Sequence, residues 1–371
     1  LRITNAFARQ LDHRKGEGIY RLTQPPRGVG SRHGQWSAIS LYCLGRYFNK
    51  DYPHPIWAQC IRGGQLAFAP LHDHAWVAGE SDNLFWYNTG IAPIFSYLVL
   101  SGDRTPIDNG VVQRLLRGQE ALISGREKDW ALNSASVGFL HKAAYLTGDS
   151  RWVTYRERTG VDTDVFRLGQ SFWPDDNLQR KAPTDLVGKW TVMSLPKPAW
   201  EARRSGLPWE QSFYFGSYRS AADASGDYIL LDGFNGASRN PYHTFAILQL
   251  RLGGSTILDG YHTQVLTSAD GTVEPTVAMD AALIHADLVG STAVAVGETP
   301  GAAYCSWRRT LAQRVGQYAL VVDDLAFRTD SRNMMAKTTW QVPGGRWAPE
   351  EQVLRLPSAN VELQSCDIQN V

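Results

Sequence analysis

Neither sign of charge is in excess in this chain of 371 residues, and cysteine is scarce. The 37 basic and 36 acidic side chains leave a formal net charge of +1, which gives no electrostatic footprint for nucleic acid or membrane. The four cysteines show no CxxC spacing, which argues against a zinc ribbon, a redox pair or a disulfide scaffold. No apolar run approaches the roughly 20 residues that cross a bilayer. We therefore expect a globular protein without nucleic-acid or membrane partners.

The motifs of several large enzyme classes are also missing. The sequence has no P-loop, GxGxxG, HExxH or GxSxG element. This argues at motif level against nucleotide-binding, dinucleotide-binding, zincin and serine-hydrolase chemistry, and no organic cofactor is expected. The chain opens on Leu1 and shows no signal-peptide pattern.

Aromatic and other apolar residues are plentiful instead. The sequence is 43% hydrophobic, which excludes intrinsic disorder, and its length predicts two domains. With 13 Trp and 15 Tyr, it has more large rings than a core of this size needs. Such rings either pack in the core or form surfaces that suit flat ligands such as sugars.

The hydrophobic period divides the chain into two parts. Residues 1–180 carry apolar side chains at three- and four-residue steps and predict helices, which recur in similar pairs like a stacked or ring-shaped array. Residues 181–212 are rich in proline and charge and predict a linker. Residues 213–371 alternate with a period of two in short segments, which predicts an antiparallel β-sandwich. The fold class is α+β with several domains.

The first candidate site is the segment SRHGQW at 31–36, which opens a predicted helix. Gly34 beside His33 leaves the imidazole uncovered, while Arg32 adds a cation and Gln35 an amide. The alternative is a histidine that only caps carbonyl groups at a helix start.

The second candidate is DNLFWYNTG at 82–90, directly before the apolar helix expected at 91–102. Tyr87 and Asn88 lie at the entry to that helix, where site residues are common on helical scaffolds. The alternative is that Trp86 and Tyr87 are packing aromatics.

The third candidate lies on predicted strands and would hold a metal. His243, Asp259 and His285 can supply three ligands to Zn²⁺ with water as the fourth. The alternative is that Asp259 closes a turn with Gly260 and that the two histidines are unrelated.

Together these segments resemble the heparinase II/III-like polysaccharide lyases, which include alginate, oligoalginate and glycosaminoglycan lyases. HGQW at 33–36 is similar to the family's Asn-His-Gly-x-Trp element, and Tyr87 follows His33 at about the family's spacing. The segments 243–261 and 307–325 resemble its His-containing strand and its Arg-rich strand pair. The sequence departs from the pattern at Arg32, where asparagine is usual, and at Pro241, where many members carry histidine.

The resemblance implies an incomplete (α/α) toroid followed by an antiparallel β-sandwich. It also implies cleavage of a uronate-containing polysaccharide by β-elimination, in a secreted or periplasmic enzyme. The uronate carboxylate must be neutralised while a base removes the C5 proton and an acid reaches the leaving oxygen. The candidates for these catalytic roles are His33, Arg32, Asn88, Tyr87 and Tyr261. The candidates for substrate binding are Gln35, Trp36, Trp86, Arg239, Tyr242 and His262. We assign His243, Asp259 and His285 to a structural Zn²⁺ site.

Two other functions fit the same sequence. A glycoside hydrolase on this scaffold would need two carboxyl groups, for which Asp73, Glu80 and Asp82 are candidates. A non-catalytic protein that binds anionic carbohydrate would need only a groove lined with aromatics. The partner in every case is an anionic polysaccharide or oligosaccharide, so we expect positive charge to be concentrated at the site.

Overall fold

The computed structural model separates the chain into two compact units, Leu1–Pro183 and Thr184–Val371. The structure describes residues 32–75, 87–125, 129, 131–132, 134–160, 178–195, 197, 200–201, 206–233, 245–259, 263–275, 281–328, 333–340, 342, 344–348, 350–351, 353–356 and 361–364.

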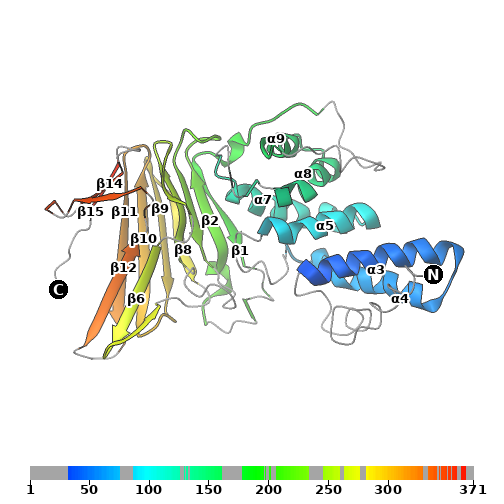
Figure 1. Ribbon diagram of the computed structural model, residues 1–371, viewed down its shortest axis with the longest axis horizontal. Helices are drawn as coiled ribbons and strands as arrows, with labels where there is room; N and C mark the ends of the chain where they lie inside the picture. Colours follow the sequence, from blue (N-terminus) through cyan, green and yellow to red (C-terminus); the bar gives the residue numbers. More distant parts are fainter. Residues whose placement is uncertain are drawn as a thin grey trace. The chain divides into compact units, whose positions relative to one another are not determined.

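The first unit is helical, as the three- and four-residue periodicity predicts (Figure 1). Its helices in the described ranges are α3 (Arg32–Asp51), α4 (Pro55–Phe68), α5 (Tyr87–Ser101), α6 (Thr105–Asp108), α7 (Val111–Leu122), α8 (Ser134–Thr147) and α9 (Arg151–Arg158). No helix in these ranges is both long enough and apolar enough to cross a membrane.

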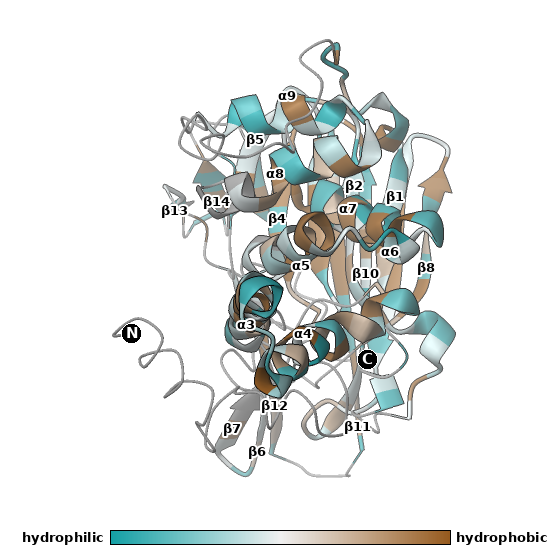
Figure 2. Ribbon diagram, turned by 90° about the vertical axis from the view of Figure 1, so that its right-hand side faces the viewer, coloured by the Kyte–Doolittle hydropathy of each residue, from teal (hydrophilic) through white to brown (hydrophobic). Residues whose placement is uncertain are grey.

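Helices α3 and α4 form a hairpin with a very close approach (Figure 1). A Cβ atom placed on Gly45 would lie 2.7 Å from the Trp57 carbonyl oxygen, and one on Gly64 would lie 2.7 Å from the Cβ of Tyr42. His54 begins α4, because its Nδ1 accepts a hydrogen bond from the Ile56 backbone N–H at 3.2 Å. Both helices carry hydrophilic and hydrophobic residues along their length (Figure 2), as amphipathic helices do.

Helix α5 is buried along most of its length, from Gly90 to Leu98. It runs parallel to α3, since three contacts join the two helices in the same order. Arg32 bonds Thr89, the Tyr42 and Tyr97 rings meet edge to face, and Arg46 donates to the Leu100 carbonyl oxygen. The first turns of α3 and α5 therefore lie at the same end of the unit.

The second unit is built from antiparallel strands, as the period of two predicts (Figure 1). One sheet has the order β1-β2-β3-β4-β5, formed by Lys189–Ser194, Phe213–Arg219, Tyr228–Asp232, Ile247–Leu252 and Ser255–Asp259. A second has the order β11-β10-β9-β8, formed by Tyr318–Phe327, Cys305–Arg314, Thr292–Thr299 and Ala282–Val289. Two further sheets are β12-β6-β7 (Met334–Trp340, Thr263–Ala269, Thr272–Pro275) and β13-β14-β15 (Arg346–Ala348, Val353–Leu356, Val361–Gln364).

The core of this unit lies between its sheets and gives it a sandwich-like arrangement. Strand β10 alternates buried and more exposed residues, so that one face points into the core. The apolar side chains that cluster there come from several sheets, among them Ile229 of β3, Val265 of β6, Ala295 of β9 and Leu311 of β10.

The expected linker at 181–212 differs from the structure. Residues 189–194 form β1, which pairs antiparallel with β2 from Lys189 opposite Arg219 onward. The alternation in KWTVMS is a strand signal, which the surrounding proline and charge concealed. Cys43, Cys60 and Cys305 are free thiols, as expected for a chain that is no disulfide scaffold.

Candidate functional site

Two of the predicted site segments meet in the helical unit. Arg32 is the first residue of α3, and its Nη1 donates a hydrogen bond to Thr89 Oγ1 at 3.0 Å, two residues into α5. The segments 31–36 and 82–90 are far apart in the sequence, and their coming together was not deducible from either one. We call this region, defined by Arg32, His33, Gln35 and Thr89, the α3/α5 junction.

The electrostatics of the α3/α5 junction favour an anion. Helix N-termini carry partial positive charge, and the ends of two parallel helices lie together here. Arg32 is half-buried at the junction and adds a full positive charge. The α3–α4 hairpin, residues 32–68, contains Arg32, Arg46, Lys50 and Arg62 against the single acid Asp51. Positive charge is thus concentrated on this hairpin, with Arg32 at the junction and Arg46 and Lys50 in the second half of α3.

The side chains that follow Arg32 face in two directions. His33 and Trp36 lie on the solvent side of α3, and Trp36 is 43% exposed, which is unusual for its size. Gln35 lies on the buried side and is 4% exposed. Its Oε1 has no hydrogen-bond partner among the described residues, so the amide retains an acceptor there. The junction thus presents a cation, an imidazole, an indole and a buried amide within one and a half helical turns.

Tyr87, a predicted catalytic residue, lies in the interior of the helical unit. Its side chain is fully buried, and its hydroxyl donates a hydrogen bond to the Leu115 carbonyl oxygen of α7 at 3.1 Å. Burial raises the pKa of Tyr87 above its ordinary value, whereas a base at neutral pH needs a lowered one. From this burial and this hydrogen bond we infer that Tyr87 fixes the start of α5 against α7, and its predicted part in proton transfer stays a prediction.

Several predicted residues lie outside the described part of the chain. These are Trp86, Arg239, Tyr242, His243, Tyr261 and His262. Asn88 is the second residue of α5, next to Thr89, but its side chain is also outside the description. The roles assigned to these residues stay predictions.

Two of the three predicted metal ligands are described, and they belong to different sheets. Asp259 ends β5 opposite Gln249, whose Nε2 donates to its Oδ1 at 2.9 Å. His285 lies on β8, exposed and opposite Val296 of β9. Among the described residues no group of three His, Cys, Asp or Glu side chains could hold a metal ion. A metal site there would need His243 as the third ligand. It would also need Asp259 and His285 to lie close together, and the pairing of their strands does not bring them together.

The acids considered for a hydrolase include Asp73, which is exposed after the short 3-10 helix that ends at His72. Glu80 and Asp82 lie outside the described residues. His72 has a different carboxylate partner, since its Nε2 lies 2.7 Å from Asp103 Oδ2. Burial acts to raise the pKa of Asp103, but hydrogen bonds from His72 and Thr105 outweigh it and hold that pKa below its ordinary value.

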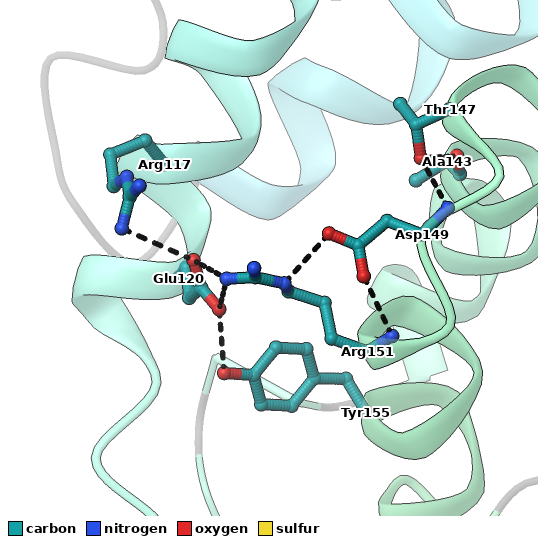
Figure 3. A network of polar contacts seen from close by, with 7 residues as sticks. All are labelled: Arg117, Glu120, Ala143, Thr147, Asp149, Arg151 and Tyr155. Carbon is teal, nitrogen blue, oxygen red and sulfur yellow. Dashed lines mark hydrogen bonds and ion pairs between the residues drawn. The ribbon is translucent and has the colours of Figure 1, made fainter. Parts of the chain in front are cut away.

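A buried network of charges in the helical unit was not predicted from the sequence (Figure 3). Glu120 of α7 is 2% exposed; its two carboxylate oxygens lie 3.0 and 3.2 Å from Arg151 Nη1, and Oε1 accepts from the Tyr155 hydroxyl at 3.1 Å. Asp149 holds the other side of Arg151, with Oδ2 2.8 Å from Nε. The one available signal was an acid, Glu120, directly before the apolar residues 121–123. The network joins α7 to α9 and supports the helix on which Tyr87 rests.

No family model matches the chain, and no curated protein matches it in sequence. Among solved structures, heparinase III is similar at 11% identity and a TM-score of 0.36, over 95% of this chain and 62% of that one. A mutant of the heparan sulfate lyase HepC from Pedobacter heparinus is similar at 12% identity and a TM-score of 0.37, over 95% and 62%. The chain thus spans less than two thirds of the length of these structures. The helices and strands of the chain itself form an α+β fold with a sandwich-like arrangement.

Proposed function

We propose that the chain is a polysaccharide lyase that cleaves a uronate-containing polymer by β-elimination and leaves a 4,5-unsaturated uronate end. The observation that carries the proposal is the α3/α5 junction. There Arg32, hydrogen-bonded to Thr89, and two helix N-termini form a positively charged site directly beside an exposed histidine and an exposed tryptophan. The similarity of residues 33–36 to the motif of the lyase family supports the same function.

The reaction explains why these groups suit the substrate. Removing the C5 proton of a uronate places more negative charge next to a carboxylate, so that carboxylate must be neutralised as the charge develops. Arg32 and the helix ends bind the carboxylate in our proposal. The neutral imidazole of His33 accepts the C5 proton, and Trp36 stacks against a sugar ring.

The remaining electrons and protons balance within the same site. The pair from the C5–H bond forms the C4–C5 double bond, and the C4–O bond breaks toward the leaving sugar. The leaving oxygen takes a proton from the imidazolium of His33 or from water. Tyr261 stays an alternative donor from the sequence, and Asn88 an additional ligand for the carboxylate. Gln35 offers its buried amide to a hydroxyl group of the sugar.

We propose the zinc site of His243, Asp259 and His285 only as a stabilising element of the second unit. The carboxylate and imidazoles are suitable ligands, but Asp259 already accepts a hydrogen bond from Gln249 and His285 lies on another sheet. No catalytic step depends on it. Elemental analysis of the purified protein should show stoichiometric Zn²⁺ that is lost in His285→Ala, and its absence from the wild type would remove the site.

The test of the lyase is the ultraviolet absorbance of the unsaturated uronate, followed on a panel of uronate polysaccharides. Arg32→Met should lower kcat/KM by roughly a hundredfold, since one positioned donor to the developing charge is lost. Arg104→Met is the matched control, because Arg104 is exposed and pairs only loosely with Asp108 at 3.7 Å. Equal activity of Arg32→Met and the wild type would contradict the assignment.

The same assay separates the two other functions. A glycoside hydrolase would release new reducing ends without ultraviolet absorbance. A carbohydrate-binding protein would bind the polymer with no product of either kind.

A further inference from the structure

The solvent side of α3 carries large aromatic side chains well beyond the α3/α5 junction. At 3.6 residues per turn, His33, Trp36, Ser40 and Tyr47 fall within an arc of about 60° on the helix. All four are exposed, and Tyr47 is 72% exposed. Trp36 and Tyr47 are eleven positions apart, which places them about 16 Å apart along the axis. We call these four residues the α3 aromatic face.

Polar groups separate the rings of the α3 aromatic face. Ser40 lies between Trp36 and Tyr47, and its hydroxyl donates to the Trp36 carbonyl oxygen at 3.0 Å. Every exposed residue of α3 is polar, charged or aromatic, and none is aliphatic. Strand β11 differs in this respect, because two aliphatic residues that follow Tyr318 are exposed there, Leu320 at 51% and Val322 at 38%. The α3 aromatic face is thus a row of separate rings and is no continuous apolar patch.

The charge of the hairpin indicates which kind of ligand would bind to the α3 aromatic face. The α3–α4 hairpin has four cations and one acid, and Lys50 is exposed one turn beyond Tyr47. A long anionic sugar chain meets both features, because its ring faces stack on aromatic side chains while its carboxylates are attracted to the cations.

We propose that the α3 aromatic face binds an extended uronate polysaccharide, with the chain continuing from the α3/α5 junction past Trp36 to Tyr47. The proposal takes its substrate class from the proposed lyase function, but it concerns binding at a distance from the reacting bond. Its consequence is a preference for long substrates. A short oligosaccharide reaches only His33 and Trp36, whereas a long one also covers Tyr47.

The experiment compares affinities by isothermal titration calorimetry for a uronate disaccharide and a dodecasaccharide from the best polymer of the panel. Tyr47→Ala should weaken binding of the dodecasaccharide by roughly five- to tenfold and leave that of the disaccharide unchanged. Tyr47→Phe should bind both like the wild type, because the ring remains. Tyr318→Ala is the matched control, since Tyr318 is 54% exposed on β11 of the other unit.

Each outcome decides one of the two proposals. Equal dodecasaccharide affinity of Tyr47→Ala and the wild type overturns the binding face even if the protein is an active lyase. A length-dependent loss in Tyr47→Ala without any unsaturated product from the wild type supports the face and contradicts the lyase. Failure of the wild type to bind either oligosaccharide overturns the face. Analytical ultracentrifugation tests a further alternative. If the wild type dimerises and Tyr47→Ala does not, the surface binds a second copy of the chain, and the proposed polysaccharide face is overturned.

Discussion

The two units each bury an arginine–carboxylate pair, but they hold it in different ways. In the second unit Arg309 of β10 lies directly opposite Asp323 of β11. Its Nε and Nη2 bond the two carboxylate oxygens at 2.7 and 2.9 Å, and Nη1 donates to the Phe245 carbonyl oxygen. In the helical unit Glu120 and Arg151 come from α7 and α9, and Asp149, Tyr155 and Arg117 surround them.

The difference lies in how many partners each charge retains when one is removed. Arg309 is 1% exposed, and Asp323 is its only carboxylate contact among the described residues. Arg151 contacts both Glu120 and Asp149 and is 13% exposed. The strand pair is therefore set by register, and without Arg309 the carboxylate of Asp323 keeps only the Trp307 indole N–H, 2.9 Å from its Oδ1, among the described residues. In the helical network Arg151 has a second carboxylate, that of Asp149. We expect removal of one charged partner to cost more in the sheet than in the helices.

Arg309→Met should have the largest effect on stability. It leaves the Asp323 carboxylate, which is 11% exposed, with the Trp307 indole N–H in place of its cation, and it removes the donor to the Phe245 carbonyl oxygen. The free energy of unfolding should fall by about 3 kcal/mol. Chemical denaturation followed by far-ultraviolet circular dichroism measures this. The control is Arg308→Met on the opposite face of the same strand, where the pair with Glu298 is exposed and should contribute less than about 1 kcal/mol.

Glu120→Gln should cost less, about 2–3 kcal/mol, because the amide can keep a hydrogen bond while Arg151 keeps Asp149. Unfolding in denaturant measures the loss. Glu157→Gln is the control, because it breaks an exposed ion pair with Arg180 and shows how little such a pair contributes. A loss equal to that of Arg309→Met would contradict the role that we give to the second carboxylate.

Lys142 of α8 tests a buried charge that has no acidic partner among the described residues. Its Nζ donates to the Gly138 carbonyl oxygen at 2.6 Å, and burial lowers the pKa of Lys142 from 10.5 to about 8. The unfolded chain thus binds more protons between these values, so this residue makes stability rise as pH increases from about 8 to 10.5. Lys142→Met should stabilise the protein at pH 7 by about 1–2 kcal/mol and remove that rise. Thermal unfolding at pH 7 and 10 checks both, and parallel pH curves for the two proteins would contradict it.

Tyr87→Phe has the smallest expected effect and tests a buried group without charge. Loss of the hydrogen bond to the Leu115 carbonyl oxygen should lower the free energy of unfolding by about 1 kcal/mol. The kcat of the proposed lyase should change little when measured well below the melting temperature. A loss of kcat by several orders of magnitude at unchanged stability would return Tyr87 to the reacting bond.

The spacing of apolar residues predicted the helical and β regions, because burial of one face of a helix or strand fixes that spacing within the element itself. The helical and β regions and the antiparallel pairing of 307–325 follow from residues close together in the chain. Strand β1 was missed because its six residues lie among prolines and charged residues, a composition typical of linkers. Its pairing with β2 could not be inferred from that composition.

The candidate site was predictable only in part, for a related reason. Arg32, His33 and Trp36 share one helical turn, so their grouping is local. The hydrogen bond from Arg32 to Thr89 depends on the parallel packing of α3 and α5, which no local pattern specifies. The burial of Tyr87 likewise depends on α7, since aromatic residues at a helix entry occur both at sites and in cores.

The glycine contacts between α3 and α4 restrict the packed side of the hairpin but not its outer, solvent-exposed side. A methyl group on Gly45 or Gly64 would collide with backbone or Cβ atoms of the facing helix, so the packed side tolerates almost no variation. Positions 36, 40 and 47 are exposed on the outer side, where we expect substitutions to leave the packing of the two helices unchanged. The hairpin can therefore acquire new ligand preferences by surface substitution alone, which makes α3 a practical place to re-engineer binding.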